Sequence, residues 1–161
     1  MSQELRDYSK HNDDSSRVYR HYSAMRSNQC LDYYRRMEKK WFGFDHGEFT
    51  IREAFDQLGS YIDSSDPDVD MPNILHGFQA AEKARKDKQP EWFQLVCLIH
   101  DLGKMMFLWG EKQDGQVGEL DGPQWGLGGD TWVLGCQIPN TVIYPELNSL
   151  SPDNFENYTR S

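Results

Sequence analysis

The chain has 161 residues, which is enough for one domain with a hydrophobic core but too few for two. Its formal net charge of -9 leaves little basic surface to neutralise phosphates, so we expect no binding to nucleic acid or to acidic membranes. The mean hydropathy is -0.81 and no long apolar run occurs, so we expect a soluble protein without a transmembrane helix.

Three cysteines, Cys30, Cys97 and Cys136, are widely separated in the sequence. No CxxC pair or Cys/His cluster indicates a zinc ribbon. The N-terminal stretch MSQELRDYSKHNDDSS lacks the apolar core of a signal peptide. Reduced thiols and no export signal predict a cytoplasmic protein.

Residues 1–15 are polar, and we expect them to form an N-terminal arm. Apolar residues at helical spacing then predict a helix from Ser16 to about Trp41. Thr50 and Glu53 have the spacing of a capping box, which marks the start of another helix. The apolar stripe of that second helix comprises Ile51, Ala54, Phe55, Leu58 and Ile62.

The segment 63–73 is rich in aspartate and proline and is expected to be a loop. It ends at Asn73, which can cap a helix over residues 74–86. Pro90 is expected at the first position of the next helix, which extends to about Trp109.

Beyond Gly110 the helical periodicity stops. A glycine-rich loop follows, with an insertion at 111–122. DTWVLG and TVIY are compatible with short strands or with extended segments, and the tail SPDNFENYTRS has no periodicity and no closing element. The sequence therefore predicts a single, mainly α domain with a loop-rich last third.

The stretch LIHDLGK places His100 beside Asp101. Both are expected to face the interior, where an unpaired carboxylate costs free energy. A metal ion would remove that cost. The alternative is a hydrogen-bonded core histidine together with an Asp101–Lys104 ion pair.

His76 lies on the preceding predicted helix, and two antiparallel helices can direct His76 and His100 to one point. With Asp101 they form an N,N,O set suited to iron, manganese or another first-row metal, rather than a zinc-thiolate site. A structural histidine is the alternative for His76. Lys104, one turn after Asp101, either directs its ammonium at a substrate oxygen or is a surface lysine.

Several ordered segments resemble the myo-inositol oxygenase family, the di-iron branch of the HD-domain superfamily. The resemblance covers residues 5–149, and HD alone is a weak signal. The specific segments are LRDY at 5–8, SDPDVDMPN at 65–73, HGFQAAE at 76–82, HDLGK at 100–104 and PQWGLGGDTWVLGC at 123–136. The resemblance implies an HD-domain-like helical bundle in a cytoplasmic, monomeric oxidoreductase.

The family resemblance also implies an activity, the four-electron ring cleavage of myo-inositol by O2 to D-glucuronate at a non-haem di-iron site. In this sequence His76, His100 and Asp101 would bind iron, with Asp101 shared by the two metals. Lys104 and Asp101 would be the catalytic residues. Substrate binding would involve Lys104 and a further set, Arg6, Asp63, Ser64, Ser65, Gly129 and Asp130.

The family's site requires two more histidines and another aspartate, and residues 102–161 contain no histidine. The sequence therefore corresponds to the N-terminal part of the family's chain, truncated at the C-terminus of the bundle. It carries half of the ligand set and at most a partial iron site, and it should expose apolar surface. The alternatives are a non-catalytic truncated fragment or isoform, and an HD-type phosphohydrolase.

Overall fold

The computed structural model describes residues 7–63, 71–119, 122–127 and 133–153. In these ranges the regular structure is helical, with no β-strand, which confirms the mainly α prediction. The α-helices are α1 (Arg17–Asn28), α2 (Leu31–Trp41), α3 (Ile51–Leu58), α4 (Asn73–Lys86), α5 (Glu91–Ile99) and α6 (Met106–Trp109), and the 3-10 helices are η1 (Leu102–Met105), η2 (Lys112–Asp114) and η4 (Pro145–Leu150).

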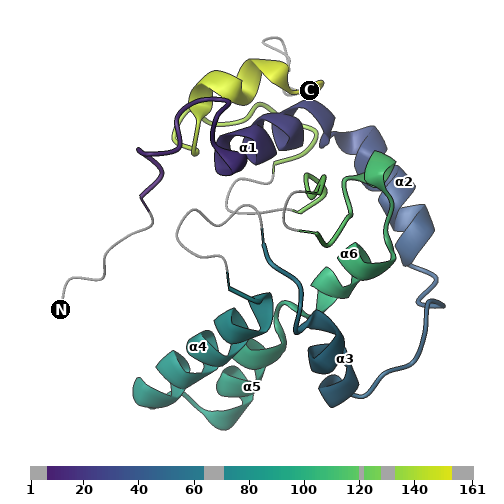
Figure 1. The fold of residues 1–161 in the computed structure, drawn as a ribbon, viewed down its shortest axis with the longest axis vertical. Helices are drawn as coiled ribbons and strands as arrows, with labels where there is room; N and C mark the ends of the chain where they lie inside the picture. Colours follow the sequence, from purple (N-terminus) through teal and green to yellow (C-terminus); the bar gives the residue numbers. More distant parts are fainter. Residues whose placement is uncertain (1–6, 64–70, 120–121, 128–132, 154–161) are drawn as a thin grey trace.

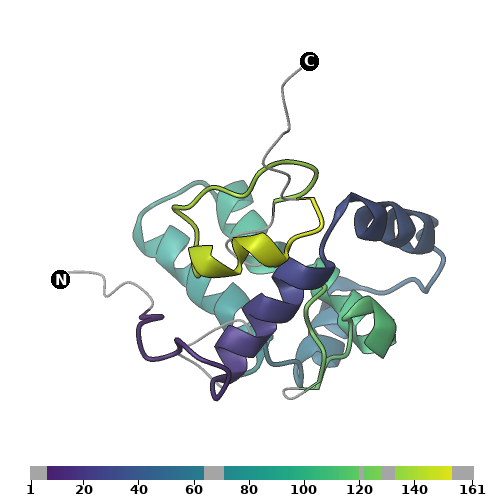
Figure 2. The same ribbon diagram turned by 90° about the horizontal axis from the view of Figure 1, so that it is seen from above.

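The helices form two groups in space. Helix α1 lies beside η4 in both views, although the two are far apart in sequence (Figures 1 and 2). Helices α4 and α5 pack against each other as a hairpin at the other end of the molecule. Helix α3 lies beside that hairpin, and α6 lies between it and the α1–η4 pair (Figure 1). None of the helices in the described ranges combines the length and the apolar character needed to cross a membrane.

The prediction of one helix from Ser16 to Trp41 is wrong, because two extended residues, Gln29 and Cys30, separate α1 from α2. The Gln29 side chain donates to two backbone carbonyls of the loop after α6, at 2.8 and 2.7 Å. The backbone N–H of Leu31 donates to Asp153 Oδ2 at 2.7 Å. These long-range hydrogen bonds outweigh the local helical pattern. Asp153 belongs to the C-terminal tail, for which the sequence predicted no closing element, and it nevertheless holds the start of α2.

Helix α3 begins as the sequence predicts. The Thr50 hydroxyl accepts from the backbone N–H of Glu53 at 3.2 Å, and the Glu53 carboxylate accepts from the Thr50 N–H at 2.8 Å. Ala54 and Leu58 are buried. The helix ends at Leu58, so Ile62, the last residue of the predicted apolar stripe, lies outside the helix.

The α4–α5 hairpin differs from the prediction at three points. Pro72 occupies the N-cap of α4, and Asn73 makes no capping bond. Pro90 is the N-cap of α5 rather than its first residue. Helix α5 ends at Ile99 instead of continuing to Trp109, because the chain turns and re-forms as η1 and α6. That turn brings η1 against α3, where a straight helix could not reach.

Two hydrophobic clusters hold the described residues together. The first joins α3 to η1 and α6 and comprises Ala54, Leu58, Tyr61, Met105, Phe107 and Leu127. The second joins α1 to the last third of the chain and comprises Val18, Tyr22, Met25, Tyr144 and Leu147. Tyr8 packs edge-on against Tyr22 and Tyr144 of the second cluster, so part of the predicted N-terminal arm contacts the core.

The loop-rich last third is anchored rather than loosely attached. Asp114, within the predicted insertion, is buried and forms an ion pair with Lys40 of α2 at 2.6 Å. Gln116 is also buried and accepts from the Trp41 indole N–H at 3.1 Å. The described residues of DTWVLG contain no strand. TVIY is neither a strand nor extended, because it forms a turn that ends with Tyr144 in the left-handed region at a φ of 53°.

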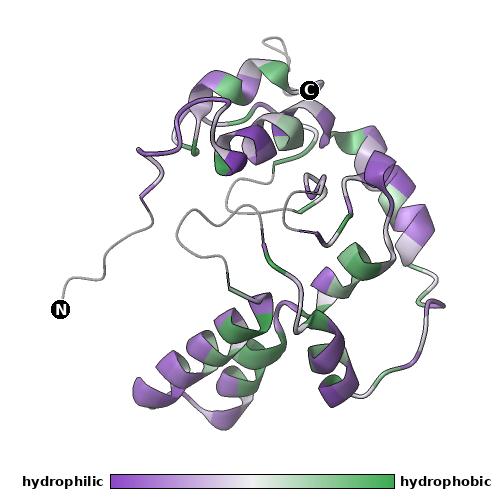
Figure 3. Ribbon diagram, viewed as in Figure 1, coloured by the Kyte–Doolittle hydropathy of each residue, from purple (hydrophilic) through white to green (hydrophobic). Residues whose placement is uncertain are grey.

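Helices α4 and α5 carry many hydrophobic residues (Figure 3), and several of their side chains are exposed. Trp92 is 66% exposed, and α5 contains no buried residue. This is the exposed apolar surface that the sequence led us to expect. We refer to the set as the α4–α5 apolar residues: Leu75, Phe78, Trp92, Phe93, Leu95 and Val96.

Candidate metal centre

Close packing of α4 against α5 brings two histidines together. Gly77, next to His76, lies so near α5 that a β-carbon there would be 2.8 Å from the Leu98 backbone oxygen. Only glycine permits that approach without a shift of one helix. The imidazole centroids of His76 and His100 are consequently 5.2 Å apart, with an interplanar angle of 70°.

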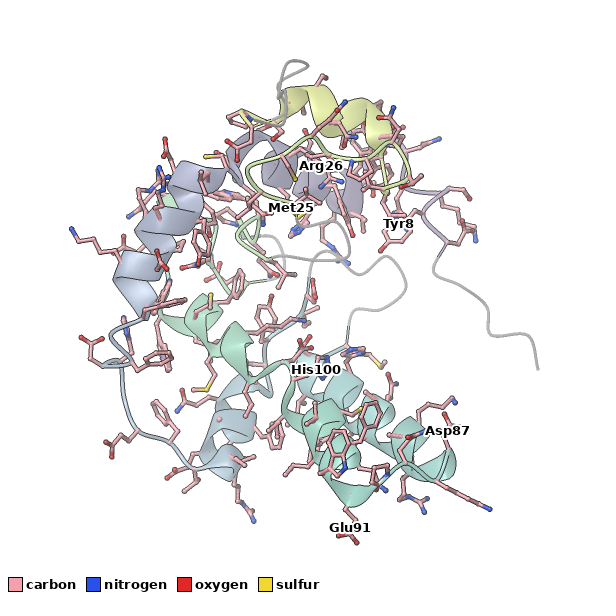
Figure 4. All side chains as sticks on the ribbon, turned by 180° about the vertical axis from the view of Figure 1, so that it is seen from behind. Tyr8, Met25, Arg26, Asp87, Glu91 and His100 are labelled. Atoms are coloured by element: carbon pink, nitrogen blue, oxygen red, sulfur yellow. The ribbon has the colours of Figure 1, made fainter. Side chains whose placement is uncertain are left out.

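Asp101 completes a three-residue cluster with these histidines. His76, His100 and Asp101 each offer one ligand atom, and these atoms lie within 4.8 Å of one another. His100 lies at the end of the hairpin that faces the rest of the molecule, opposite the tip marked by Asp87 and Glu91 (Figure 4). The sequence prediction that these three residues converge is therefore confirmed.

The hydrogen bonds of His100 leave one ring nitrogen available. Its Nδ1 lies 2.8 Å from the backbone oxygen of Cys97, an acceptor, so Nδ1 carries the proton. Its Nε2 lies 3.5 Å from Asp101 Oδ1 and keeps a free lone pair in this tautomer. A backbone carbonyl that fixes the tautomer in this way is the usual support of a metal-binding imidazole.

The expected burial of His100 is wrong. Its side chain is 38% exposed, whereas that of Asp101 is 19% exposed. The prediction requires the core-facing stripe of the helix to continue past Ile99, and α5 ends at Ile99. The alternative of a core histidine fails for the same reason, and an accessible imidazole pair suits a site that exchanges ligands with solvent.

Lys104 is a partly buried lysine and not a surface lysine. Its ammonium donates to Asp101 Oδ2 and Asp63 Oδ2, both at 3.0 Å, and to Asn73 Oδ1 at 2.8 Å. Three acceptors match the three N–H donors of an ammonium group. The predicted Asp101–Lys104 ion pair thus exists, and through Lys104 it extends to Asp63.

Sequence reasoning missed the role of Asn73. Its side chain donates to Asp101 Oδ2 at 3.0 Å and accepts from Lys104, and the residue is only 6% exposed. Its place before a helix predicts a capping role, which is the commonest use of an asparagine there. Its spacing of one helical turn before His76 is the signal that could have revealed it.

The two oxygens of Asp101 have different surroundings. Oδ2 accepts from both Asn73 and Lys104, whereas Oδ1 faces His100. Oδ1 with two imidazole nitrogens makes an N,N,O donor set without thiolate, which fits iron or manganese. The residues present therefore fit part of an iron site.

The acidic character of this region also acts on Tyr61, which is fully buried and donates its hydroxyl to Gln124 Oε1 at 3.1 Å. Burial raises the pKa of the Tyr61 hydroxyl, and the charges of Asp63 and Asp101 raise it further.

Of the other predicted substrate-binding residues, Arg6, Ser64, Ser65, Gly129 and Asp130 lie outside the described ranges.

A helical fold that joins an upstream histidine to a His-Asp pair is the arrangement of an HD-type metal site. The family model described as Myo-inositol oxygenase matches residues 15–161. The chain belongs to the myo-inositol oxygenase family.

Curated relatives agree with the family assignment. The chain is 41% identical over 131 residues to an inositol oxygenase of Rattus norvegicus, covering 80% of this chain and 41% of the relative. It is 38% identical over 129 residues to one of Danio rerio, covering 80% and 42%. It is 37% identical over 150 residues to a probable inositol oxygenase of Oryza sativa subsp. japonica, covering 92% and 46%. The chain spans less than half the length of these relatives.

Proposed function

We propose that this chain carries the first part of the iron site of an inositol oxygenase, an oxidoreductase that cleaves myo-inositol with O2 to D-glucuronate. The observation that carries the proposal is the convergence of His76, His100 and Asp101 within 4.8 Å. The relatives are named inositol oxygenases, which supports inositol as the substrate and oxygenation as the reaction. Cleavage to D-glucuronate is what the family resemblance implies. Iron held by His76, His100 and Asp101 would supply Lewis acidity and redox chemistry with dioxygen.

The role we assign to Lys104 is to orient a hydroxyl group of the polyol. All three of its N–H donors are engaged, with Asp63, Asn73 and Asp101. A substrate oxygen must therefore replace one of these acceptors, and the ammonium then favours the alkoxide form of that oxygen. Asp101 has a second role here, because it shares its charge between the metal and Lys104.

Recognition of the polyol is assigned to Asp63 and to Arg6, Ser64, Ser65, Gly129 and Asp130. Charged and backbone groups of this kind suit a substrate that presents only hydroxyl groups. We further propose a monomeric protein of the cytoplasm that binds neither nucleic acid nor membranes. The net charge of -9 and the free thiols of Cys30, Cys97 and Cys136 support this part of the proposal.

Metal binding by the 161-residue chain tests the proposal directly. Ferrous iron is titrated under anaerobic conditions, and bound iron is measured after desalting. His76→Ala and His100→Ala should each lower the affinity at least about tenfold. His46→Ala is the matched control, because His46 is exposed and lies outside the cluster, and it should bind iron as the unaltered chain does.

Product assays then separate the candidate activities. The same chain is incubated with myo-inositol and O2 and assayed for D-glucuronate, and with p-nitrophenyl phosphate for phosphatase activity. Iron binding that depends on both histidines supports the proposal. Phosphate release that depends on them would favour an HD-type phosphohydrolase instead. A chain that binds no iron would overturn the metal role, and two bound irons with turnover would overturn our account of the missing ligands.

A further inference from the structure

We propose that Asn73 is a positioning residue that fixes Asp101 and Lys104 in one closed hydrogen-bond ring. The inference rests on the metal site proposed above and adds a residue to it. Asn73 Nδ2 donates to Asp101 Oδ2 at 3.0 Å, Lys104 Nζ donates to Asn73 Oδ1 at 2.8 Å, and Lys104 Nζ donates to Asp101 Oδ2 at 3.0 Å. Each pair of the three side chains is therefore joined.

An amide side chain is well suited to this position. It must donate to a carboxylate on one side and accept from an ammonium on the other at the same time. A carboxylate at position 73 could not donate, and an ammonium could not accept. An alanine would leave both bonds unmade in a site where Asp101 is mostly shielded from water.

The backbone of Asn73 is itself held in place. Its N–H donates to the Tyr61 carbonyl at 2.7 Å, and the neighbouring Pro72 forms an isolated bridge with Ile62. The residue is also the first of α4, so one helical turn separates it from His76. Asn73 thus links the segment that carries Asp63, the helix that carries His76 and the turn that carries Asp101.

The ring determines which oxygen of Asp101 is offered to a metal. Oδ2 receives two donors, so its lone pairs are occupied, whereas Oδ1 remains on the side of His100. Without Asn73 the carboxylate could rotate and exchange its oxygens, and the ammonium of Lys104 would lose one of its three acceptors. Groups that orient a metal ligand in this way typically change metal affinity by about 10- to 100-fold.

The test compares Asn73→Ala with Gln79→Ala, which removes a side-chain amide from an exposed position of the same helix. Mn(II) affinity is measured from the electron paramagnetic resonance signal of the free ion. We expect Asn73→Ala to weaken Mn(II) binding about tenfold or more relative to Gln79→Ala. Asn73→Ser, whose hydroxyl can replace one of the two bonds but not the geometry of both, should fall between them.

A second readout needs no metal. Lys104 is labelled with acetic anhydride in the metal-free chain, and its modification is compared by mass spectrometry with that of the exposed Lys88 in the same sample. Loss of one acceptor should raise the labelling of Lys104 several-fold in Asn73→Ala but not in Gln79→Ala. Circular dichroism checks that each variant keeps its helices, and Asn73→Ser replaces Asn73→Ala if the latter does not fold.

The outcomes separate the two proposals. Weaker Mn(II) binding with faster Lys104 labelling supports the ring and its role. Unchanged labelling, or unchanged affinity in a chain that binds Mn(II), overturns the positioning role of Asn73. If the unaltered chain binds neither Mn(II) nor Fe(II) while the variant still exposes Lys104, the ring is supported and the proposed metal site is overturned.

Discussion

Gly77 of α4 and Leu98 of α5 are in such close contact that a β-carbon on Gly77 would lie 2.8 Å from the Leu98 carbonyl oxygen. A backbone atom cannot move aside as the end of a flexible side chain can. The contact therefore sets the separation of the two helices at the level of the histidine pair. The distance between His76 and His100 depends on a residue that has no side chain of its own.

The first prediction follows from this contact. Gly77→Ala should push α4 from α5, destabilise the chain by about 1–3 kcal/mol and weaken Mn(II) binding. The measurements are urea denaturation and metal titration. Gly103→Ala is the control, because a β-carbon at Gly103 meets no atom within 4 Å. That control should be neutral or stabilising by up to about 1 kcal/mol, since it restricts the unfolded chain. Equal stability and metal affinity of Gly77→Ala and the unaltered chain would contradict the steric argument.

The second prediction concerns pH. Burial lowers the pKa of the His21 imidazole from 6.5 to about 4, against a smaller opposing effect of Asp63. Between these pH values the unfolded chain binds a proton that the folded chain does not. The free energy of unfolding should therefore fall as the pH drops from about 6.5 to 4, by up to about 3 kcal/mol from this group. Above pH 6.5 the contribution of His21 to the pH dependence disappears.

Urea denaturation over a pH series measures this effect as a difference between variants. His21→Gln cannot titrate, so its stability should depend less on pH between 4 and 6.5 than that of the unaltered chain. His46→Gln removes an exposed imidazole and serves as the control. Parallel pH profiles for His21→Gln and the unaltered chain would refute the assignment.

A third prediction tests the local signal at the start of α3. Thr50→Ala removes the hydroxyl that accepts from the Glu53 N–H and should cost about 1 kcal/mol of stability. Thr50→Ser keeps the hydroxyl and should remain close to the unaltered chain. Thermal and urea denaturation compare the two variants. A Thr50→Ala variant as stable as Thr50→Ser would show that the capping box contributes nothing measurable.

A fourth prediction concerns the α4–α5 apolar residues. Trp92→Glu changes a side chain that is 66% exposed, so the free energy of unfolding should shift by no more than about 0.5 kcal/mol. The same change should reduce the binding of an apolar dye. Gln89→Glu adds an equal charge at an exposed polar position and should alter neither property. Chemical denaturation and dye fluorescence provide the measurements, and unchanged dye binding by Trp92→Glu would show that the α4–α5 apolar residues do not bind apolar molecules.

The sequence predicted elements whose signals are local. The Thr50–Glu53 box marks the start of α3 correctly, because both partners lie within one turn. The break at Gln29 was missed, since its side chain is held by carbonyls from residues almost a hundred positions later. A local sequence pattern contains no information about a hydrogen bond between residues so far apart in the chain.

The candidate site likewise contains features that the sequence predicted and features that it did not. The spacing of His76, His100 and Asp101 predicted their convergence, because two adjacent antiparallel helices can bring residues at this spacing to the same end of the hairpin. The predicted burial of His100 is wrong because α5 ends at Ile99, one residue before it. The role of Asn73 depends on a triangle of side chains from α4 and the turn after α5, which no single periodicity encodes.

Arg26 has a consequence for the synthesis of the chain. Its guanidinium donates to Asn148 and to the Ile143 carbonyl, residues separated from it by 122 and 117 positions. A nascent chain leaving the ribosome therefore presents α1 long before its partners exist. Until η4 emerges, Val18, Tyr22 and Met25 lack the cluster that covers them. Contacts of such long sequence separation form slowly, so α1 is made before the other described helices and its apolar face is among the last to be covered, which leaves it exposed to aggregation or to chaperone binding.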